Sequence, residues 1–470
     1  MHSIWAVAVN TVKQALRLKI AAVFIILLLV LLPLMSVVMT GDGTVKGRLQ
    51  TFVSYGLSLA NLLLCLLTII VAVYSVTSDF QDRQVYTVLT KPVRRCQFLL
   101  GKLLGVILLG AALLVLFSTI VYAITISMPR LADVGKTESA RRSVAKAVER
   151  RRLDDEFFTA RASLRPAEPD VSKEVEETYK RLEKNRQLPQ DVLEDERSRR
   201  SYIAALTRRK KIGKRAVSVG EDLVWEFYDV KPLDPNKHLF LRFKYDVSVN
   251  PPDLCVFGRW EIGDYRQVKY GAAIETPIYR FDRKDTIRTF HEIEVPGDAI
   301  TDDGYLAVRF VNVPLNDTVV VFGPQDGMEV LYKADTFTVN FIRAVILIFF
   351  RLIFLAGLGV LASTFLSFPV AVLLCLVVFF TATISGFCLE SFKVLGDSAG
   401  FVYSYTLRPL IHLLPRFDKF NPSNFLIPGR LLSWTLLAEA AGLMVCVKAG
   451  LLVLLGLLIF SYREIAKIIV

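Results

Sequence analysis

The chain has 470 residues, of which 53% are hydrophobic, and its mean hydropathy is +0.44. Several apolar runs of about 20 residues exceed what the core of a water-soluble domain uses, so we expect an integral membrane protein. The net charge of +12 does not indicate a nucleic-acid-binding protein, because acidic residues interrupt the basic runs and no recognised nucleic-acid-binding module surrounds them.

The first 19 residues predict an amphipathic helix at the membrane surface. Trp5, Val9, Val12 and Leu16 share one face of this helix, and the polar residues Asn10, Lys13, Gln14 and Arg17 point away from it.

Six apolar runs can cross a hydrocarbon layer about 30 Å thick as helices that rise about 1.5 Å per residue. They are Ile20 to Met39, Leu57 to Val76, Leu99 to Ile126, Ala344 to Leu366, Val370 to Leu389 and Ser433 to Phe460. The first run is too long for the apolar region of a signal peptide, and Thr40-Gly41-Asp42 lacks a cleavage site of the A-x-A kind. We therefore expect it to remain as a span. The predicted membrane portions are residues 20–127 and 341–470.

The orientation of the spans follows from the short hairpin 78–102 between the second and third spans. This hairpin carries Arg83, Lys91, Arg94, Arg95 and Lys102 against Asp79 and Asp82. Short loops rich in Lys and Arg stay in the cytoplasm, so both termini are predicted to be cytoplasmic and residues 128–340 extracytoplasmic. The insertion is also basic, but long translocated segments do not follow this rule.

The insertion divides into two parts by the period of its apolar residues. In residues 128–215, charged residues dominate and apolar residues recur at helical spacing, as at Val171, Val175 and Tyr179. This pattern predicts two or three long exposed helices, with an antiparallel hairpin as one arrangement.

Residues 216–340 change to a period of two, which predicts an extracytoplasmic β-sandwich of jelly-roll type. In the first strand, Leu239, Leu241, Phe243, Tyr245 and Val247 alternate with His238, Phe240, Arg242, Lys244 and Asp246. The further predicted strands are Leu254 to Ile262, His291 to Val295, Tyr305 to Val313, Thr318 to Phe322, Met328 to Tyr332 and Thr336 to Asn340.

Aromatic residues in this domain allow two interpretations. Trp225, Tyr228, Trp260, Tyr265 and Tyr279 either form a sugar-binding platform or pack the sandwich and its border with the helices.

The sequence offers no catalytic residues, no metal site and no cofactor site. Its six cysteines and four histidines are dispersed, without a CxxC or HExxH motif. It also lacks the GxxxxGK[ST] phosphate-binding loop, so ATP, if used, is bound by another subunit.

The hairpin itself has two interpretations. Ser78 and Gln81 resemble the capping box of a short helix that Pro92 ends, which would display Asp82, Arg83 and Gln84 to the cytoplasm. Such a helix, tied to two spans, would transmit a push to both. The alternative is an ordinary basic loop.

The stretch from Asp79 to Gly105 resembles the first cytoplasmic loop of ABC-2 type permeases. The residues that carry the resemblance are Arg83-Gln84, Thr87, Val88-Leu89, Lys91-Pro92-Val93-Arg94-Arg95 and Gly101-Lys102, with Gln84 near a position where members often carry Glu. The resemblance implies that this loop is the coupling helix that docks on an ATPase subunit. The implied contact residues are Asp82, Arg83, Gln84, Tyr86, Thr87, Lys91, Pro92, Arg94 and Arg95.

Other segments agree with this resemblance. Met1 to Lys19 is similar to the amphipathic elbow helix of these permeases, and Ser363 to Pro369 is similar to the turn between their fourth and fifth spans. Leu414 to Pro422 with Gly429-Arg430 resembles their external segment, predicted as 390–432, and Phe460 to Glu464 resembles their basic ending. The most similar group is that associated with multicopper-enzyme maturation. The resemblance implies a bacterial inner-membrane protein, a second permease subunit, and ATP and Mg on a separate ATPase subunit.

Two charged residues of the sixth span, Glu439 and Lys448, need an explanation, since charges inside a membrane are costly. They are nine residues apart and lie on opposite sides of an α-helix. One interpretation puts Glu439 near the outer interface and lets Lys448 either snorkel to the membrane surface or meet a partner permease. The alternative is a role of both residues in translocation.

These observations favour the permease subunit of an ABC-2 type transporter. The alternative is a non-transporting membrane anchor that displays a ligand- or glycan-binding sandwich to an envelope partner. A membrane-embedded enzyme comes third.

Overall fold

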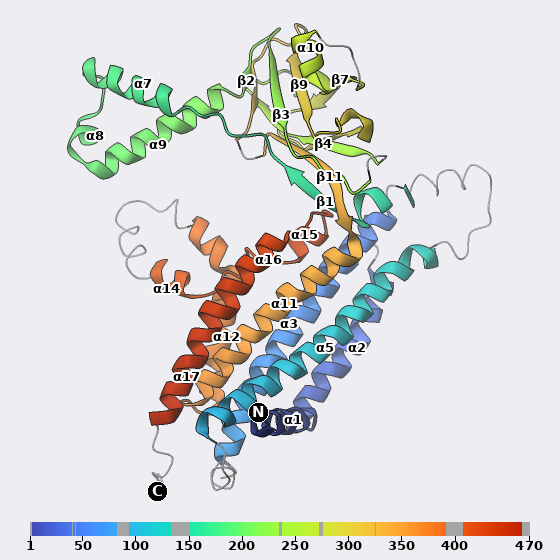
Figure 1. Ribbon diagram of the computed structural model, residues 1–470, viewed down its shortest axis with the longest axis vertical. Coiled ribbons are helices and arrows are strands. Elements are labelled where there is room, and N and C mark those ends of the chain that lie inside the picture. Colours follow the sequence, from blue (N-terminus) through green and yellow to red (C-terminus); the bar gives the residue numbers. More distant parts are fainter. Residues whose placement is uncertain are drawn as a thin grey trace. The chain divides into compact units, whose positions relative to one another are not determined.

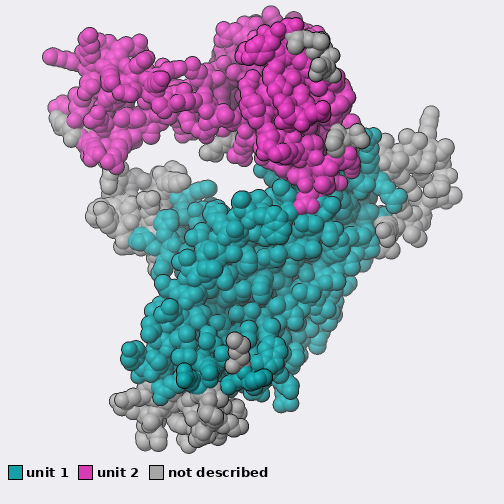
Figure 2. Space-filling model, in the orientation of Figure 1, with its two compact units in different colours: residues 1–160, 336–470 teal, residues 161–335 magenta. Residues whose placement is uncertain are grey.

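The chain forms two compact units, residues 1–160 with 336–470 and residues 161–335 (Figure 2). The structure is a computed structural model. It describes residues 2–39, 41–42, 44–81, 94–132, 150–151, 153–234, 237–271, 276–324, 326–391 and 408–462.

Six helices among the described residues are long and apolar enough to cross a membrane, which confirms the six predicted spans. They are α2 (Lys19–Val38), α3 (Val45–Gln81), α5 (Arg95–Ala132), α11 (Phe337–Ser363), α12 (Phe368–Ser391), and a last span that runs from α16 (Trp434–Ala440) through a π-helical segment (Ala441–Ala449) to α17 (Gly450–Tyr462). Helices α3, α5 and α11 pack on one another and are at least half buried in their apolar windows (Figure 1).

Helix α3 is much longer than the apolar run that predicted it. Its 37 residues span about 55 Å, well beyond the hydrocarbon layer. The helix continues through Ser78 without a break, so the predicted helix start at Ser78 and Gln81 is wrong. The local sequence resembles a cap, but packing against neighbouring helices keeps this stretch helical.

The amphipathic helix at the N-terminus is α1 (His2–Leu16). Its buried residues are small ones, Ala8, Thr11 and Ala15, whereas Trp5 and Leu16 are more than half exposed. The helix therefore turns its small-residue face to the other helices and leaves large apolar side chains for a membrane interface. Gln14, predicted to point away from the apolar face of the helix, contacts α3 and α5, as shown below.

Between α12 and α16 the chain forms two short helices, α14 (Arg408–Leu413) and α15 (Ser423–Leu426), joined by turns. This is the described part of the predicted segment 390–432.

The second unit is built on antiparallel strands. Two four-stranded sheets have the orders β1-β11-β4-β8 and β3-β9-β6-β7, and a third, β2-β10-β5, continues the first, because β10 pairs with β5 as β11 pairs with β4. The strands are β1 (Thr159–Leu164), β2 (Ala216–Val217), β3 (Asp222–Phe227), β4 (Leu239–Phe243), β5 (Tyr245–Val247), β6 (Cys255–Gly263), β7 (Tyr279–Thr286), β8 (His291–Val295), β9 (Leu306–Asn312), β10 (Val320–Phe322) and β11 (Met328–Thr336).

The core of this unit is aromatic. The alternation predicted for Leu239 to Val247 is confirmed, since all five apolar positions are buried. Phe310 is the cross-strand neighbour of Trp260, and Phe243 belongs to the other four-stranded sheet; their ring centroids lie 4.7 and 4.2 Å from that of Trp260. Trp225 is buried here too, so neither tryptophan of the suggested sugar platform is available to a ligand.

Helices and one further strand complete the insertion. Helices α7 (Ser172–Lys184), α8 (Gln190–Glu194) and α9 (Glu196–Gly213) form a hairpin, and α10 (Tyr265–Tyr270) follows β6 (Figure 1). Strand β1 lies inside the range 128–215 that was predicted to be helical, which corrects that prediction. The predicted strand Thr336 to Asn340 is also wrong, because the Thr336 side chain accepts a hydrogen bond from the Val339 N–H and caps α11.

Replacing Phe310 by Ala removes a fully buried ring from the core and should lower the free energy of unfolding of the sandwich by about 3–5 kcal/mol. Urea unfolding of the full chain in neutral detergent, followed by near-ultraviolet circular dichroism, measures this change. The control is Tyr228→Ala, at a 63% exposed position. An equal midpoint for both variants would contradict the assigned core.

Candidate functional site at the base of the basic hairpin

The described part of the predicted coupling hairpin is its base. Asp82, Arg83, Gln84, Tyr86, Thr87, Lys91 and Pro92 lie outside the described residues. Arg94 is exposed, and its backbone N–H donates to the side chain of Gln97 at the start of α5. Arg95 donates from Nη1 to the Ser461 carbonyl, 3.0 Å away, near the end of α17.

A buried ion pair joins the two helices that carry the hairpin. Lys102 Nζ of α5 lies 2.7 Å from Asp79 Oδ2 of α3, and their side chains are only 2% and 7% exposed. Buried charges are costly unless they are paired and hydrogen-bonded, so this pair fixes the separation of α3 and α5 at this level.

Gln14 of α1 forms hydrogen bonds with both members of this ion pair. Its side-chain oxygen accepts from Lys102 Nζ at 3.1 Å, and its nitrogen donates to the Ser78 hydroxyl at 2.9 Å and to Asp79 Oδ1 at 3.4 Å. One amide therefore contacts both charges and a neighbouring hydroxyl. Helix α1 is thereby bound to α3 and α5 together.

Two glycines let α1 approach α5 closely enough for these bonds. A Cβ on Gly101 would lie 2.7 Å from Val7 Cβ, and one on Gly105 would lie 2.7 Å from the Ala8 carbonyl oxygen. Such distances are shorter than real Cβ atoms allow, so only glycine fits both positions. The two residues form a GxxxG motif, which favours close packing of helices in membranes.

Aromatic residues extend the cluster to α17. The ring centroid of Phe460 lies 6.0 Å from that of Phe80 and 6.1 Å from that of Phe98. Lys102 Nζ lies 5.6 Å from the centroid of the Phe98 ring. We call the set Gln14, Asp79, Phe98, Lys102 and Phe460 the hairpin clamp. Through it, α1, α3, α5 and α17 are tied together where the hairpin begins and ends.

Glu439 and Lys448 bind different parts of the segment after α12. Glu439 pairs with Lys419, and Lys448, inside the π-helical segment, donates to the carbonyls of His412 and Leu414. Lys448 thus satisfies carbonyls at the end of α14, which that short helix leaves unpaired.

Three residues of α11 that were not predicted from the sequence also bind the segment between α12 and α16. Asn340 exchanges two hydrogen bonds of 2.8 Å with the backbone of Arg430 and Leu432, and Arg343 donates to the Leu432 carbonyl. Arg351 is 4% exposed and donates to the carbonyls of Phe417 and Phe420 at 2.5 and 3.2 Å. Arg351 lies within a predicted span, so a charge inside an apolar run was the signal that would have found it.

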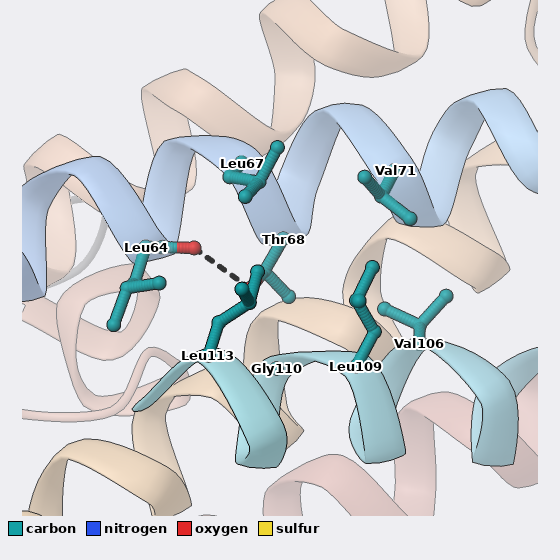
Figure 3. Close-up of a pocket in the computed structure, with 8 residues that line it drawn as sticks. All are labelled: Leu64, Leu67, Thr68, Val71, Val106, Leu109, Gly110 and Leu113. Atoms are coloured by element: carbon teal, nitrogen blue, oxygen red, sulfur yellow. Dashed lines mark hydrogen bonds between the residues drawn. The ribbon is translucent and has the colours of Figure 1, made fainter. Parts of the chain in front are cut away.

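A narrow apolar groove lies between α3 and α5, and its cavity volume is about 10 Å³ (Figure 3). Leu64, Leu67, Thr68, Val71, Val106, Leu109, Gly110 and Leu113 line it. The Thr68 hydroxyl donates to the Leu64 carbonyl at 2.7 Å, so its proton is already used within α3. The groove offers a ligand mainly apolar contact.

Comparison with protein-family models, curated proteins and solved structures found no match for this chain. Among the described residues, the fold has six helices long and apolar enough to cross a membrane and a separate antiparallel β domain.

Lys102→Met leaves Asp79 buried without its partner and should lower the free energy of unfolding by about 3–5 kcal/mol. Replacing both residues, as Asp79→Leu with Lys102→Met, should recover most of this loss, because no charge is left buried. Thermal unfolding in detergent micelles compares the three proteins. A double variant as unstable as the single one would show that the pair does not carry the clamp.

Gly105→Ala should loosen α1, because the added methyl group collides with the Ala8 carbonyl and Thr11. Trypsin cleavage after Lys13 and Arg17 should then be faster than in the native protein. The matched control is Gly442→Ala, where no atom lies within 4 Å of the new Cβ. Equal cleavage rates in the two variants would refute the close approach.

Proposed function

We propose that this protein is the permease subunit of an ABC-2 type transporter, and that a separate ATPase subunit pushes on the hairpin between α3 and α5. The hairpin clamp is the observation that carries this proposal. A force applied to residues 82–93 enters two long helices that are bound together by a buried ion pair and by α1, so both spans would move with it.

The proposal assigns the remaining parts accordingly. The membrane is the bacterial inner membrane, both termini and the hairpin are cytoplasmic, and residues 128–340 are extracytoplasmic. ATP and Mg bind to the partner ATPase, and a second permease subunit, identical or different, completes the transporter. The basic residues Arg94 and Arg95 at the hairpin base agree with a cytoplasmic side.

Polar residues on α3 support a transport path. Ser54, Ser58 and Asn61 recur at helical spacing within the span, Ser58 is exposed, and Asn61 is partly exposed. Polar groups within a membrane span usually face protein or water. We assign this face to the path between two permease subunits.

The strand order supports a jelly roll for the extracytoplasmic domain. Along the chain, the eight strands β1, β3, β4, β6, β7, β8, β9 and β11 pass back and forth between the two four-stranded sheets. The exception is β6 and β7, which follow one another in the same sheet; this order is that of a double Greek key. A second candidate function, a membrane anchor that displays a ligand-binding sandwich, rests on Tyr228. This ring is 63% exposed and lies 5.4 Å from the Tyr305 ring.

Pull-down of the tagged chain from native membranes tests the proposal. We expect an ABC-type ATPase to co-purify with the native chain and to be lost with Arg94→Glu, which reverses an exposed charge at the hairpin base. Lys13→Glu, an exposed charge reversal on α1, should keep it. A native chain that purifies without any ATPase would favour the anchor, and an undiminished complex in Arg94→Glu would count against docking at the hairpin base.

A further inference from the structure

The hairpin of α7, α8 and α9, which we call the arm, extends from the sandwich within the second unit (Figure 1). It has a small core of its own, in which Tyr179, Leu188 and Val192 are buried. From Ser172 to Arg215 the sequence contains 14 Lys or Arg and 8 Asp or Glu, a balance of +6. The arm therefore presents charge with little apolar burial.

One group of cations is used inside the second unit, either between the arm and the chain outside it or between α9 and α7. Arg215 donates from Nη1 to the carbonyls of Gly323 and Pro324, at 3.0 and 2.8 Å. Lys211 pairs with Glu168, and Lys214 lies 2.8 Å from Glu174. These side-chain hydrogen bonds lower the pKa values of both carboxyl groups. These three cations act within the fold.

A second group forms a strip on α9. Arg200, Ser201, Ala204, Ala205, Arg208 and Arg209 are all exposed and follow one side of the helix over about 14 Å. The charge of Arg200 is partly neutralised by Glu196, whose Oε1 lies 2.5 Å from Arg200 Nη2. Among the described residues, Arg208 and Arg209 have no ion-pair or hydrogen-bond partner, and the strip itself contains no carboxylate.

We propose that this strip of α9 binds a linear polyanion that carries repeated phosphate groups. The exposed arginines supply charge and hydrogen-bond donors in a fork that fits phosphate oxygens. The small side chains of Ser201, Ala204 and Ala205 let an extended chain lie close to the helix between the charged ends. Arg215 and Lys211 attach the arm, and Lys214 ties α9 to α7 within it, so little order must be gained on binding.

The strip differs from a helix that inserts into a bilayer. Helices of that kind bury Trp, Phe or Leu on one face, and the strip has no large apolar side chain. Its chemistry is electrostatic and linear, which favours a polymer over a lipid surface. This inference does not depend on the transport proposal.

Binding of long-chain inorganic polyphosphate to the full protein in neutral detergent tests the proposal. Affinity should fall with rising salt, because each arginine that neutralises a phosphate releases a counterion. Arg208→Ala with Arg209→Ala should weaken binding about tenfold at about 0.1 M salt and reduce the slope of log K against log salt by about 2. Alanine is a strong helix former, so α9 should stay folded.

The control is Arg181→Ala with Lys184→Ala, which removes the same charge from exposed positions on α7. This variant should keep most of the affinity. Equal losses in both double variants would mean that only total charge matters and would overturn the proposal. A second experiment measures flotation of the full protein with phosphatidylglycerol vesicles. Strong vesicle binding without polyphosphate binding would overturn the proposal in favour of a lipid surface.

Discussion

The helices of the first unit, residues 1–160 with 336–470, depend on one interaction, the ion pair between Asp79 and Lys102. Neither charge can remain unpaired away from water, so α3 and α5 must stay in contact at this level, and Gln14 must reach both residues. That requirement explains the glycines at 101 and 105, because a side chain at either position would hold α1 too far away. A pair that is weak evidence for stability by itself thereby specifies how three helices are arranged.

The same rule governs the segment between α12 and α16, where the buried groups are backbone carbonyls. Arg351, near the middle of α11, donates to two of them, Lys448 donates to two others, and Asn340 and Arg343 bind the chain just before α16. Irregular backbone at membrane depth is tolerated where protein groups satisfy it. The 27-residue helix α11 therefore supports this segment and also packs on α3 and α5.

The sequence predicted the parts of this fold that depend on local pattern. Apolar length was enough for the six spans, and period-two alternation was enough for Leu239 to Val247. Local signals failed where distant packing decides the structure: Ser78 resembles a cap but lies inside α3, and Thr336 to Asn340 resembles a strand but starts α11. Asp79 and Lys102 were singled out for their charge, and Lys102 also as part of the Gly101-Lys102 pattern. Their contact with Gln14 depends on three helices, which no spacing within one segment reveals. Arg351 was visible as a charge in a span, but its carbonyl partners lie 66 and 69 residues away.

The central claim is that the two ends of the hairpin form one mechanical body with α1. Hydrogen–deuterium exchange of the full chain, comparing the native protein with Lys102→Met, measures this directly through the backbone amides of residues 74–81 and 95–105. We expect slow exchange of both stretches in the native protein and faster exchange of both together in the variant. Fast exchange in the native protein, or a change in only one stretch, would contradict it.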